Sequence, residues 1–168
     1  MKRITIPTTK EQIRDLKAGD MILISGTILT GRDAVLPKVV KAVEEGTLAD
    51  LGIDLEGQLM FHTAVSPAGV GPTSSNKLEI EGTMQILSEA GIRVHLGKGQ
   101  LKPETIEMLA EKDSVYAVIP PVTALLESKT ISRKVLAFEE LGMEALHILE
   151  IEDYPAIVAA AGGKSIYE

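Results

Sequence analysis

Short apolar runs and helically spaced apolar positions alternate along this chain. Residues 21–24 form a continuous apolar run, which predicts a strand buried on both faces that ends at Ser25 and Gly26. Apolar residues recur at helical spacing over residues 36–45, and this predicts a helix with Pro37 in its first turn and Gly46 as its stop.

The same patterns predict the remaining elements, and they mix strands with helices throughout. Further strands are expected at residues 4–6, 59–64, 94–96, 115–119, 135–138, 145–151 and 157–161. Further helices are expected at residues 9–16, 83–90 and 103–112, and a loop rich in glycine and proline at residues 66–75. With no repeat and no linker, residues 1–168 are expected to form a single α/β domain, with a mixed sheet or small barrel flanked by helices.

Composition narrows the class of protein. Hydrophobic residues make up 45% and charged residues 24%, as in a folded globular protein, and only 3% are aromatic, so aliphatic side chains must fill the core. The 17 basic and 24 acidic residues give a net charge of −7, which argues against nonspecific nucleic-acid binding. No apolar run has the length of a membrane span and the start lacks the apolar region of a signal peptide, so we expect a cytoplasmic protein with no membrane partner.

The chain contains no cysteine. This excludes disulfides, thiolate metal sites and a cysteine nucleophile in this chain. An iron–sulfur cluster would need thiolates from another chain.

Three glycine-containing segments are candidates for a binding or catalytic site. In residues 25–33, backbone N–H groups before the predicted helix and the guanidinium of Arg32 could bind a carboxylate, although a capped turn with a surface arginine explains the pattern too. In residues 69–77, three hydroxyl residues follow a Gly-Pro turn and precede Lys77, which suits an anion site or simply a polar loop. Lys98 between two glycines could likewise bring a charge to a ligand or mark a plain turn.

Together the three segments offer cations beside glycines and hydroxyls in an otherwise acidic chain. If they meet in space, they would suit a small dianion such as a dicarboxylate.

The sequence context of the other polar residues indicates structural roles. His62, His95 and His147 lack metal-ligand spacing and are interpreted as packed or surface residues. Glu79 and Glu81 alternate, which is typical of a solvated strand face.

Five ordered motifs resemble a known family. They are Ser25-Gly26 with residues 29–34, then Gly71-Pro72-Thr73-Ser74-Ser75, then Gly97-Lys98-Gly99, and finally residues 137–145 and 151–156. In this order they resemble the β subunit of class I fumarate hydratases and of L-tartrate dehydratases, which is also the C-terminal domain of single-chain class I fumarases.

The resemblance implies a swivelling β/β/α domain that works in a hetero-oligomeric [4Fe–4S] hydro-lyase. In this family an α subunit carries the cluster cysteines, and a chain without cysteine fits the β role, with no metal bound by this chain alone. The expected activity is interconversion of (S)-malate with fumarate and water, a reaction of the tricarboxylic acid cycle, and only with the α subunit. L-tartrate dehydratase β subunit and a stand-alone dicarboxylate-binding domain are the alternatives.

The resemblance also implies roles for individual residues. Arg32, with Gly31 beside it, matches the arginine expected to bind a substrate carboxylate. Thr73 matches the threonine expected to take the C3 proton, and Lys98 the lysine expected to stabilise the charge that develops on the substrate.

Gly71 lies in the Gly-Pro turn before Thr73, and the resemblance implies that it takes part in substrate binding. Three positions depart from the family pattern. Lys77 stands where the family has arginine and gives a point charge instead of a fork. Residues 35–37 and the pair Pro120-Pro121 also depart, so the rim of the pocket and the substrate preference could differ.

Overall fold

The computed structural model describes residues 2–31, 34–66, 69–73, 77–97, 100–119 and 130–166. The strands are β1 (Lys2–Ile6), β2 (Met21–Thr30), β3 (Leu59–Phe61), β4 (Thr63–Ser66), β5 (Gly69–Thr73), β6 (Val94–Gly97), β7 (Val115–Val118), β8 (Thr130–Ala137), β9 (Leu146–Ala161) and β10 (Lys164–Ser165). The helices are α1 (Lys10–Arg14), α2 (Leu36–Glu45), α3 (Lys77–Glu89) and α4 (Pro103–Glu111), with 3-10 turns η1 (Ala49–Leu51) and η2 (Glu139–Glu144).

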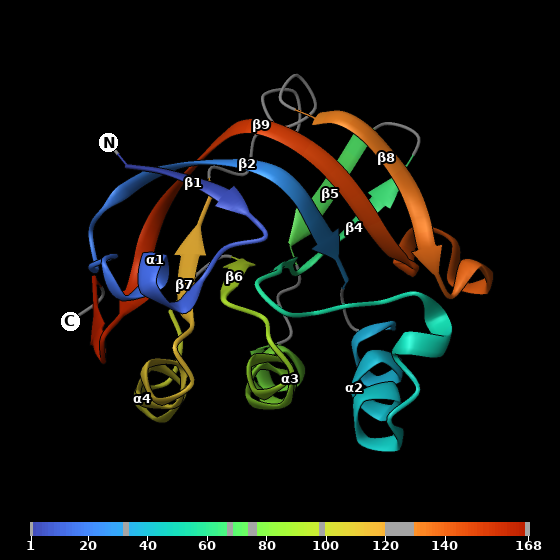
Figure 1. Cartoon of the computed structure of the whole chain (residues 1–168), viewed down its shortest axis with the longest axis horizontal. Helices are drawn as coiled ribbons and strands as arrows, with labels where there is room; N and C mark the ends of the chain where they lie inside the picture. The colour runs from blue at the N-terminus through green and yellow to red at the C-terminus, as the bar shows by residue number, and fades with distance from the viewer. Residues whose placement is uncertain are drawn as a thin grey trace.

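The central element is a small closed barrel. Strands β2, β3, β6 and β7 run parallel in that spatial order, and β9 pairs antiparallel with both β7 and β2 to close the ring. β1 pairs with the first half of β2, while β8 and β10 pair with β9. In Figure 1, β2 and β9 arch together over the other strands of the barrel. The expected α/β fold with a mixed sheet or small barrel is therefore confirmed.

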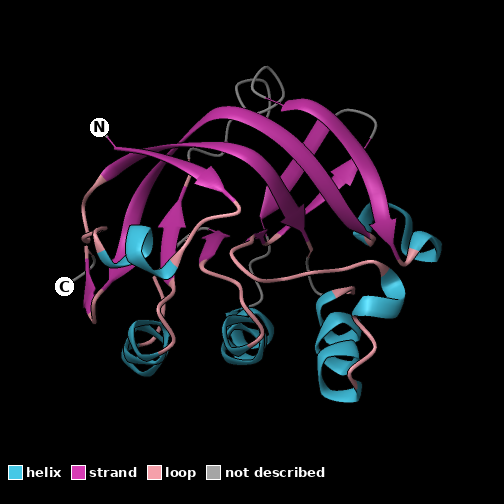
Figure 2. Cartoon of the chain, viewed as in Figure 1, coloured by secondary structure: helices cyan, strands magenta, loops and turns pink. Residues whose placement is uncertain are grey.

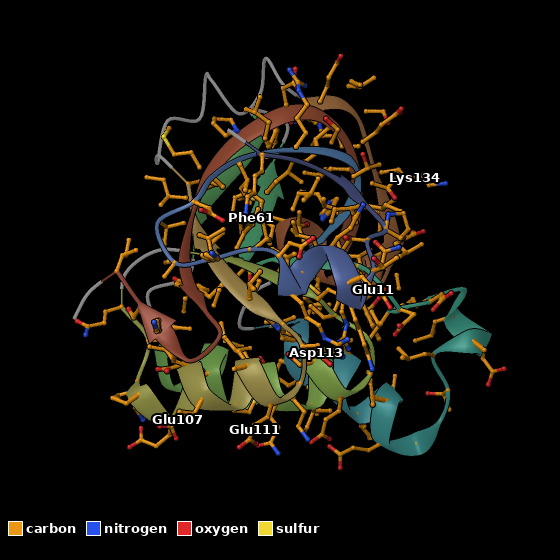
Figure 3. All side chains as sticks on the ribbon, turned by 60° about the vertical axis from the view of Figure 1, so that its left-hand side comes forward. Glu11, Phe61, Glu107, Glu111, Asp113 and Lys134 are labelled. Carbon is orange, nitrogen blue, oxygen red and sulfur yellow. The ribbon has the colours of Figure 1, made fainter. Side chains whose placement is uncertain are left out.

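Alternation of side chains along the parallel strands separates two layers of core. Leu59 and Phe61 of β3 join the barrel core together with Leu96 of β6. Met60, between the two β3 residues, joins a second core beneath α2. In Figure 3, Phe61 lies inside the barrel, whereas Lys134 on β8 points away from it. The few aromatic side chains suffice because the narrow barrel interior is filled mainly by aliphatic residues.

The helices α2, α3 and α4 lie side by side on the same side of the barrel (Figure 2). α2 contributes Val39 to the core that Met60 joins, and Leu87 of α3 belongs to that core too. Met84 of α3 packs instead in a third core with Leu109 of α4. α3 therefore bridges the other two helices. Among the described residues, no helix has both the length and the apolar character needed to cross a membrane.

One prediction about β2 is wrong in an informative way. The strand does not end at Ser25 and Gly26 but continues to Thr30, because Gly26 forms a bulge at φ 112° where the register with β9 shifts. A Cβ at Gly26 would lie 2.2 Å from the carbonyl oxygen of Ile6 on β1, so only glycine allows this approach. Across the bulge, the backbone N–H of Asp153 donates to Ser25 Oγ over 3.0 Å. A residue pair that resembles a turn therefore bends a continuous strand.

Other boundaries also differ from the predictions. The loop expected at residues 66–75 instead contains β5, which forms a hairpin with β4. The strand expected at residues 59–64 is divided at His62 into β3 and β4. Glu79 and Glu81 lie in α3, which begins at Lys77, so they do not share a strand face. The two strands expected at residues 145–151 and 157–161 are one long strand, β9.

Candidate functional site

The carboxyl ends of the parallel strands bring two of the three candidate segments to one edge of the barrel. Residues Thr30, Phe61 and Leu96 are register partners on β2, β3 and β6, so Gly31, His62 and Gly97 follow them at the same edge. Two backbone hydrogen bonds tie this edge together: Gly31 N–H donates to Phe61 O and His62 N–H to Leu96 O, each over 3.0 Å. A single strand, β3, therefore separates the segments of Gly31 and Gly97 at this edge.

The third segment returns to the same edge through the β4–β5 hairpin. Thr73, the last residue of β5, pairs with Thr63, which directly follows His62. Gly71 lies two residues earlier on the same strand. α3 then begins at Lys77, four residues after Thr73 in the sequence.

Gly31 is fixed by close packing at the start of α2. A Cβ on Gly31 would lie 2.8 Å from Val35 Cγ1 and 3.0 Å from Leu36 Cδ2. Both neighbours are buried, so they have little room to yield. The strand end that leads to Arg32 is therefore held tightly against the next helix.

The structure thus places four of the six candidate site residues. Gly31, Gly71, Thr73 and Lys77 belong to the described residues. Arg32 and Lys98 lie outside them, as does the pair Pro120-Pro121. Leu36 and Pro37, part of the departure at residues 35–37, form the first turn of α2.

A buried polar cluster below this edge was not predicted from the sequence. His62 Nε2 and His95 Nδ1 are 3.2 Å apart, and Ser88 Oγ lies 2.9 Å from His95 Nε2. The two imidazole rings stack with centroids 5.4 Å apart. All three side chains are fully buried. Burial, the neighbouring His62 and the positive charge of Arg93 hold the pKa of His95 well below its ordinary value.

Strand alternation was the signal that could have revealed this cluster. Val94 and Leu96 point into the barrel, which turns His95 outward. The same alternation from Leu59 and Phe61 turns His62 to that outer side. The interpretation of both histidines as packed residues is confirmed, but their mutual contact across two strands was missed.

His147 occupies a separate place on β9, opposite Thr30. Its Nδ1 lies 3.1 Å from the carbonyl oxygen of Ala145. Burial lowers the pKa of His147, while the contact with that carbonyl partly opposes the shift. This residue too is packed, as the sequence indicated.

The donor groups of this chain do not fit an iron–sulfur cluster. The chain has no cysteine to supply thiolates. Within the described ranges, no group of three or more histidine, cysteine, aspartate or glutamate side chains could hold a metal ion. The imidazoles of His62 and His95 face each other and Ser88 instead of a shared empty position.

Comparison with protein families matches the description "Fumarase C-terminus" to residues 1–168. The chain belongs to this family. The family resemblance inferred from the five motifs is therefore confirmed.

Individual relatives carry the names of hydratases and dehydratases. A Geobacillus stearothermophilus protein named "Putative fumarate hydratase class I" is 31% identical over 96% of this chain and 32% of its own length. A Methanocaldococcus jannaschii protein named "Putative L(+)-tartrate dehydratase subunit beta" is 29% identical over 95% of this chain and 88% of its own. The Escherichia coli L(+)-tartrate dehydratase subunit beta is 24% identical over 95% of this chain and 83% of its own.

The chain thus spans about a third of the length of the Geobacillus relative and most of the length of the two β subunits. The names of these relatives support the expected hydro-lyase class. Both fumarate and L(+)-tartrate occur among them.

Proposed function

We propose that residues 1–168 form the β-subunit domain of a [4Fe–4S]-dependent hydro-lyase, with (S)-malate and fumarate as its substrate pair. The observation that carries the proposal is the meeting of the segments of Gly31, Thr73 and Gly97 at one barrel edge. Loops at the carboxyl ends of parallel strands are common positions for ligand sites. The names of the relatives point to the same class of reaction.

In this proposal the cations at the edge hold the two carboxylates of the substrate. Arg32 follows Gly31 directly, and its guanidinium can bind one carboxylate through two parallel hydrogen bonds. Lys77 begins α3 and Lys98 follows Gly97, so each can add a point charge. Because only one strand lies between the outer segments, their side chains can reach the two ends of one four-carbon diacid.

Proton transfer is assigned to the hairpin. Thr73 takes the proton from C3 of malate while the hydroxyl group leaves from C2, and a group of the partner subunit protonates that hydroxyl, which yields fumarate and water. Lys98 stabilises the negative charge that develops on the carboxylate next to C3. A threonine hydroxyl is a weak base, so residues of the partner subunit must draw off its proton.

The partner is an α subunit that carries the cluster cysteines. It supplies the cluster, because this chain has no thiolate to contribute. The relatives named as β subunits support such a hetero-oligomer.

The test is to co-produce the chain with its α subunit without oxygen and to follow fumarate by its ultraviolet absorbance. Arg32→Ala should raise KM for malate about 10- to 100-fold, the value of a charge-assisted hydrogen bond. Thr73→Ala should lower kcat at least about 100-fold, and Thr73→Ser should keep most of the activity. Arg14→Ala is the matched control, since Arg14 pairs with Asp113 just before β7, at the opposite end of the strands. Full activity of Arg32→Ala and Thr73→Ala would show that the site is elsewhere.

A second candidate, L-tartrate dehydratase, is favoured by the names of the two relatives that are matched over most of their length. The two reactions differ by one substrate hydroxyl group, which the hydroxyl residues of the hairpin motif could bind. Comparing kcat/KM of the assembled complex for malate and L-tartrate decides between them.

A stand-alone dicarboxylate-binding domain is the third candidate. It requires that the isolated chain bind malate tightly with no catalytic partner. Isothermal titration of malate into the isolated chain measures this. Weak or no binding by the chain alone, with activity in the assembled complex, supports the subunit.

A further inference from the structure

Three buried polar side chains form a continuous hydrogen-bonded row between the barrel and α3. The row runs from Ser88 Oγ to His95 Nε2 over 2.9 Å and from His95 Nδ1 to His62 Nε2 over 3.2 Å. Each of the three side chains has an exposed fraction of 0%. Burial of such groups is costly unless they are hydrogen-bonded, and apolar residues would fill the same space without that cost.

Each member of the row belongs to a stretch of chain that leads to a candidate site residue. His62 lies directly before β4, and the hairpin that starts there ends at Thr73. Ser88 lies in α3, which begins at Lys77. His95 lies on β6, three residues before Lys98. The row therefore joins the hairpin, the helix and the strand of the candidate site from below.

His62 has a central place in this arrangement. It follows β3, the strand between β2 and β6, so it stands between Gly31 and Gly97 at the barrel edge. Its backbone N–H donates to Leu96 O, so both its backbone and its side chain are tied to β6. A shift of His62 would move the start of the β4–β5 hairpin relative to β6.

Arg93 holds the other end of the row in place. Its guanidinium donates to Ser88 O over 2.7 Å and to Gly91 O over 3.0 Å, both near the end of α3. It also donates to the carbonyl oxygens of Lys112 and Asp113 at the end of α4. Cations are favourable at helix carboxyl ends, so this contact fixes α3 and α4 against the start of β6.

The hydrogen bonds of the row are coupled. A neutral imidazole has one N–H donor and one acceptor nitrogen, so the tautomer of His95 sets the direction of both of its hydrogen bonds. If Ser88 donates to His95 Nε2, then His95 Nδ1 must donate to His62. If His62 donates to His95 Nδ1, then His95 Nε2 must donate to Ser88.

We propose that Ser88, His95 and His62 act as a positioning network that sets the hairpin of Thr73 against β6, the strand that precedes Lys98 in the sequence. This inference rests on the proposed function for its catalytic consequence. The network itself touches no substrate and transfers no proton to it. Its contribution is geometric, and small displacements of catalytic groups cost activity steeply, up to about 100-fold for 1 Å.

Ser88→Ala is the decisive variant, because it removes a single oxygen from the row. Ser114→Ala is the matched control: Ser114 is also buried and its Oγ donates to Ile92 O over 2.7 Å, but it lies before β7, at the amino ends of the strands. In the complex with the α subunit, Ser88→Ala should lower kcat about tenfold with KM within twofold, which is a fraction of the loss that a 1 Å displacement causes. Ser114→Ala should leave both constants unchanged. Equal effects of the two variants on kcat would overturn the proposal.

Nitrogen NMR of the imidazole rings tests the network in the isolated full chain, without the partner. Ser88→Ala should shift the ring nitrogens of His95 and also those of His62, together with the backbone amides of Thr63 and Thr73. Ser114→Ala should shift none of them. An unchanged His62 ring in Ser88→Ala would overturn the coupling. If the NMR shifts occur but the wild-type complex acts on no hydroxy diacid, the network is supported and the proposed function fails.

Discussion

The buried imidazole of His95 should make the chain sensitive to mild acid. Burial, His62 and Arg93 hold its pKa well below the ordinary 6.5. In the unfolded chain His95 takes up a proton near pH 6.5, while in the native chain it does not. Acid therefore stabilises the unfolded state, and the contribution of His95 to stability is complete above about pH 6.5 and is lost as the pH falls below it.

The size of this loss of stability in acid depends only on the pKa of His95 in the unfolded chain, as long as the native imidazole stays neutral. The loss is RT ln(1 + 10^(6.5 − pH)), about 1.4 kcal/mol at pH 5.5 and about 2 kcal/mol at pH 5.0. The chain has three histidines, and the lowered pKa of His147 acts in the same direction. The carboxyl groups with lowered pKa values titrate from 3.8 or 4.5 downward and so fall outside this window.

The assay is urea unfolding, followed by circular dichroism, at several pH values between 7.5 and 5.0. His95→Gln removes the titrating group, so its free energy of unfolding should fall less steeply with acid than that of the wild type, by up to about 2 kcal/mol over the range. The slope is the readout, because the variant is expected to be less stable at every pH. Ser114→Ala, which alters no titrating group, should keep the wild-type slope. The reasoning is refuted if His95→Gln and the wild type lose stability in parallel.

Three further substitutions test the packing that shapes the barrel. Gly26→Ala should destabilise the chain by several kcal/mol more than Gly19→Ala in thermal unfolding. Both glycines have positive φ, which costs an alanine about 1–2 kcal/mol at either position. Only at Gly26 would the new Cβ also meet the backbone oxygen of Ile6, at 2.2 Å, whereas Gly19 has open space around it. Arg93→Lys should cost at least about 3 kcal/mol in urea unfolding, because lysine cannot reach the carbonyls at the ends of both helices. Gly31→Ala would place a Cβ 2.8 Å from a methyl group of Val35, just before α2. The assembled complex should therefore lose activity as well as stability. An unchanged kcat/KM would show that the packing of Gly31 does not support the proposed site.

Local pattern was sufficient to predict elements whose two faces differ or whose ends carry strong signals. The apolar run at Val115 and the proline at the start of α4 both predicted the right element. Gly26 shows where local pattern fails. Whether Ser-Gly makes a turn or a bulge depends on β1 and β9, which approach it from distant parts of the sequence.

The candidate site also combines features that local sequence predicts with features that depend on distant parts of the chain. The family motifs named its residues, but the sequence left their meeting in space as an assumption. The parallel register of β2, β3 and β6 supplies that meeting for Gly31 and Gly97, and the hairpin supplies it for Thr73. The pairing of His62 with His95 was missed because it joins residues of two strands, and no single strand contains the signal.

The two ends of the parallel strands carry different kinds of polar contact. At the amino ends, Lys2 pairs with Asp20 before β2, and Arg14 pairs with Asp113 before β7. Arg93, before β6, caps two helices. At the carboxyl ends lie Gly31 and Gly97, which directly precede Arg32 and Lys98 in the sequence. These contacts at the amino ends hold strands and helices together through residues other than the proposed site residues. Under the proposed function, substitutions of the carboxyl-end residues should change the substrate preference while the contacts at the amino ends keep the barrel intact.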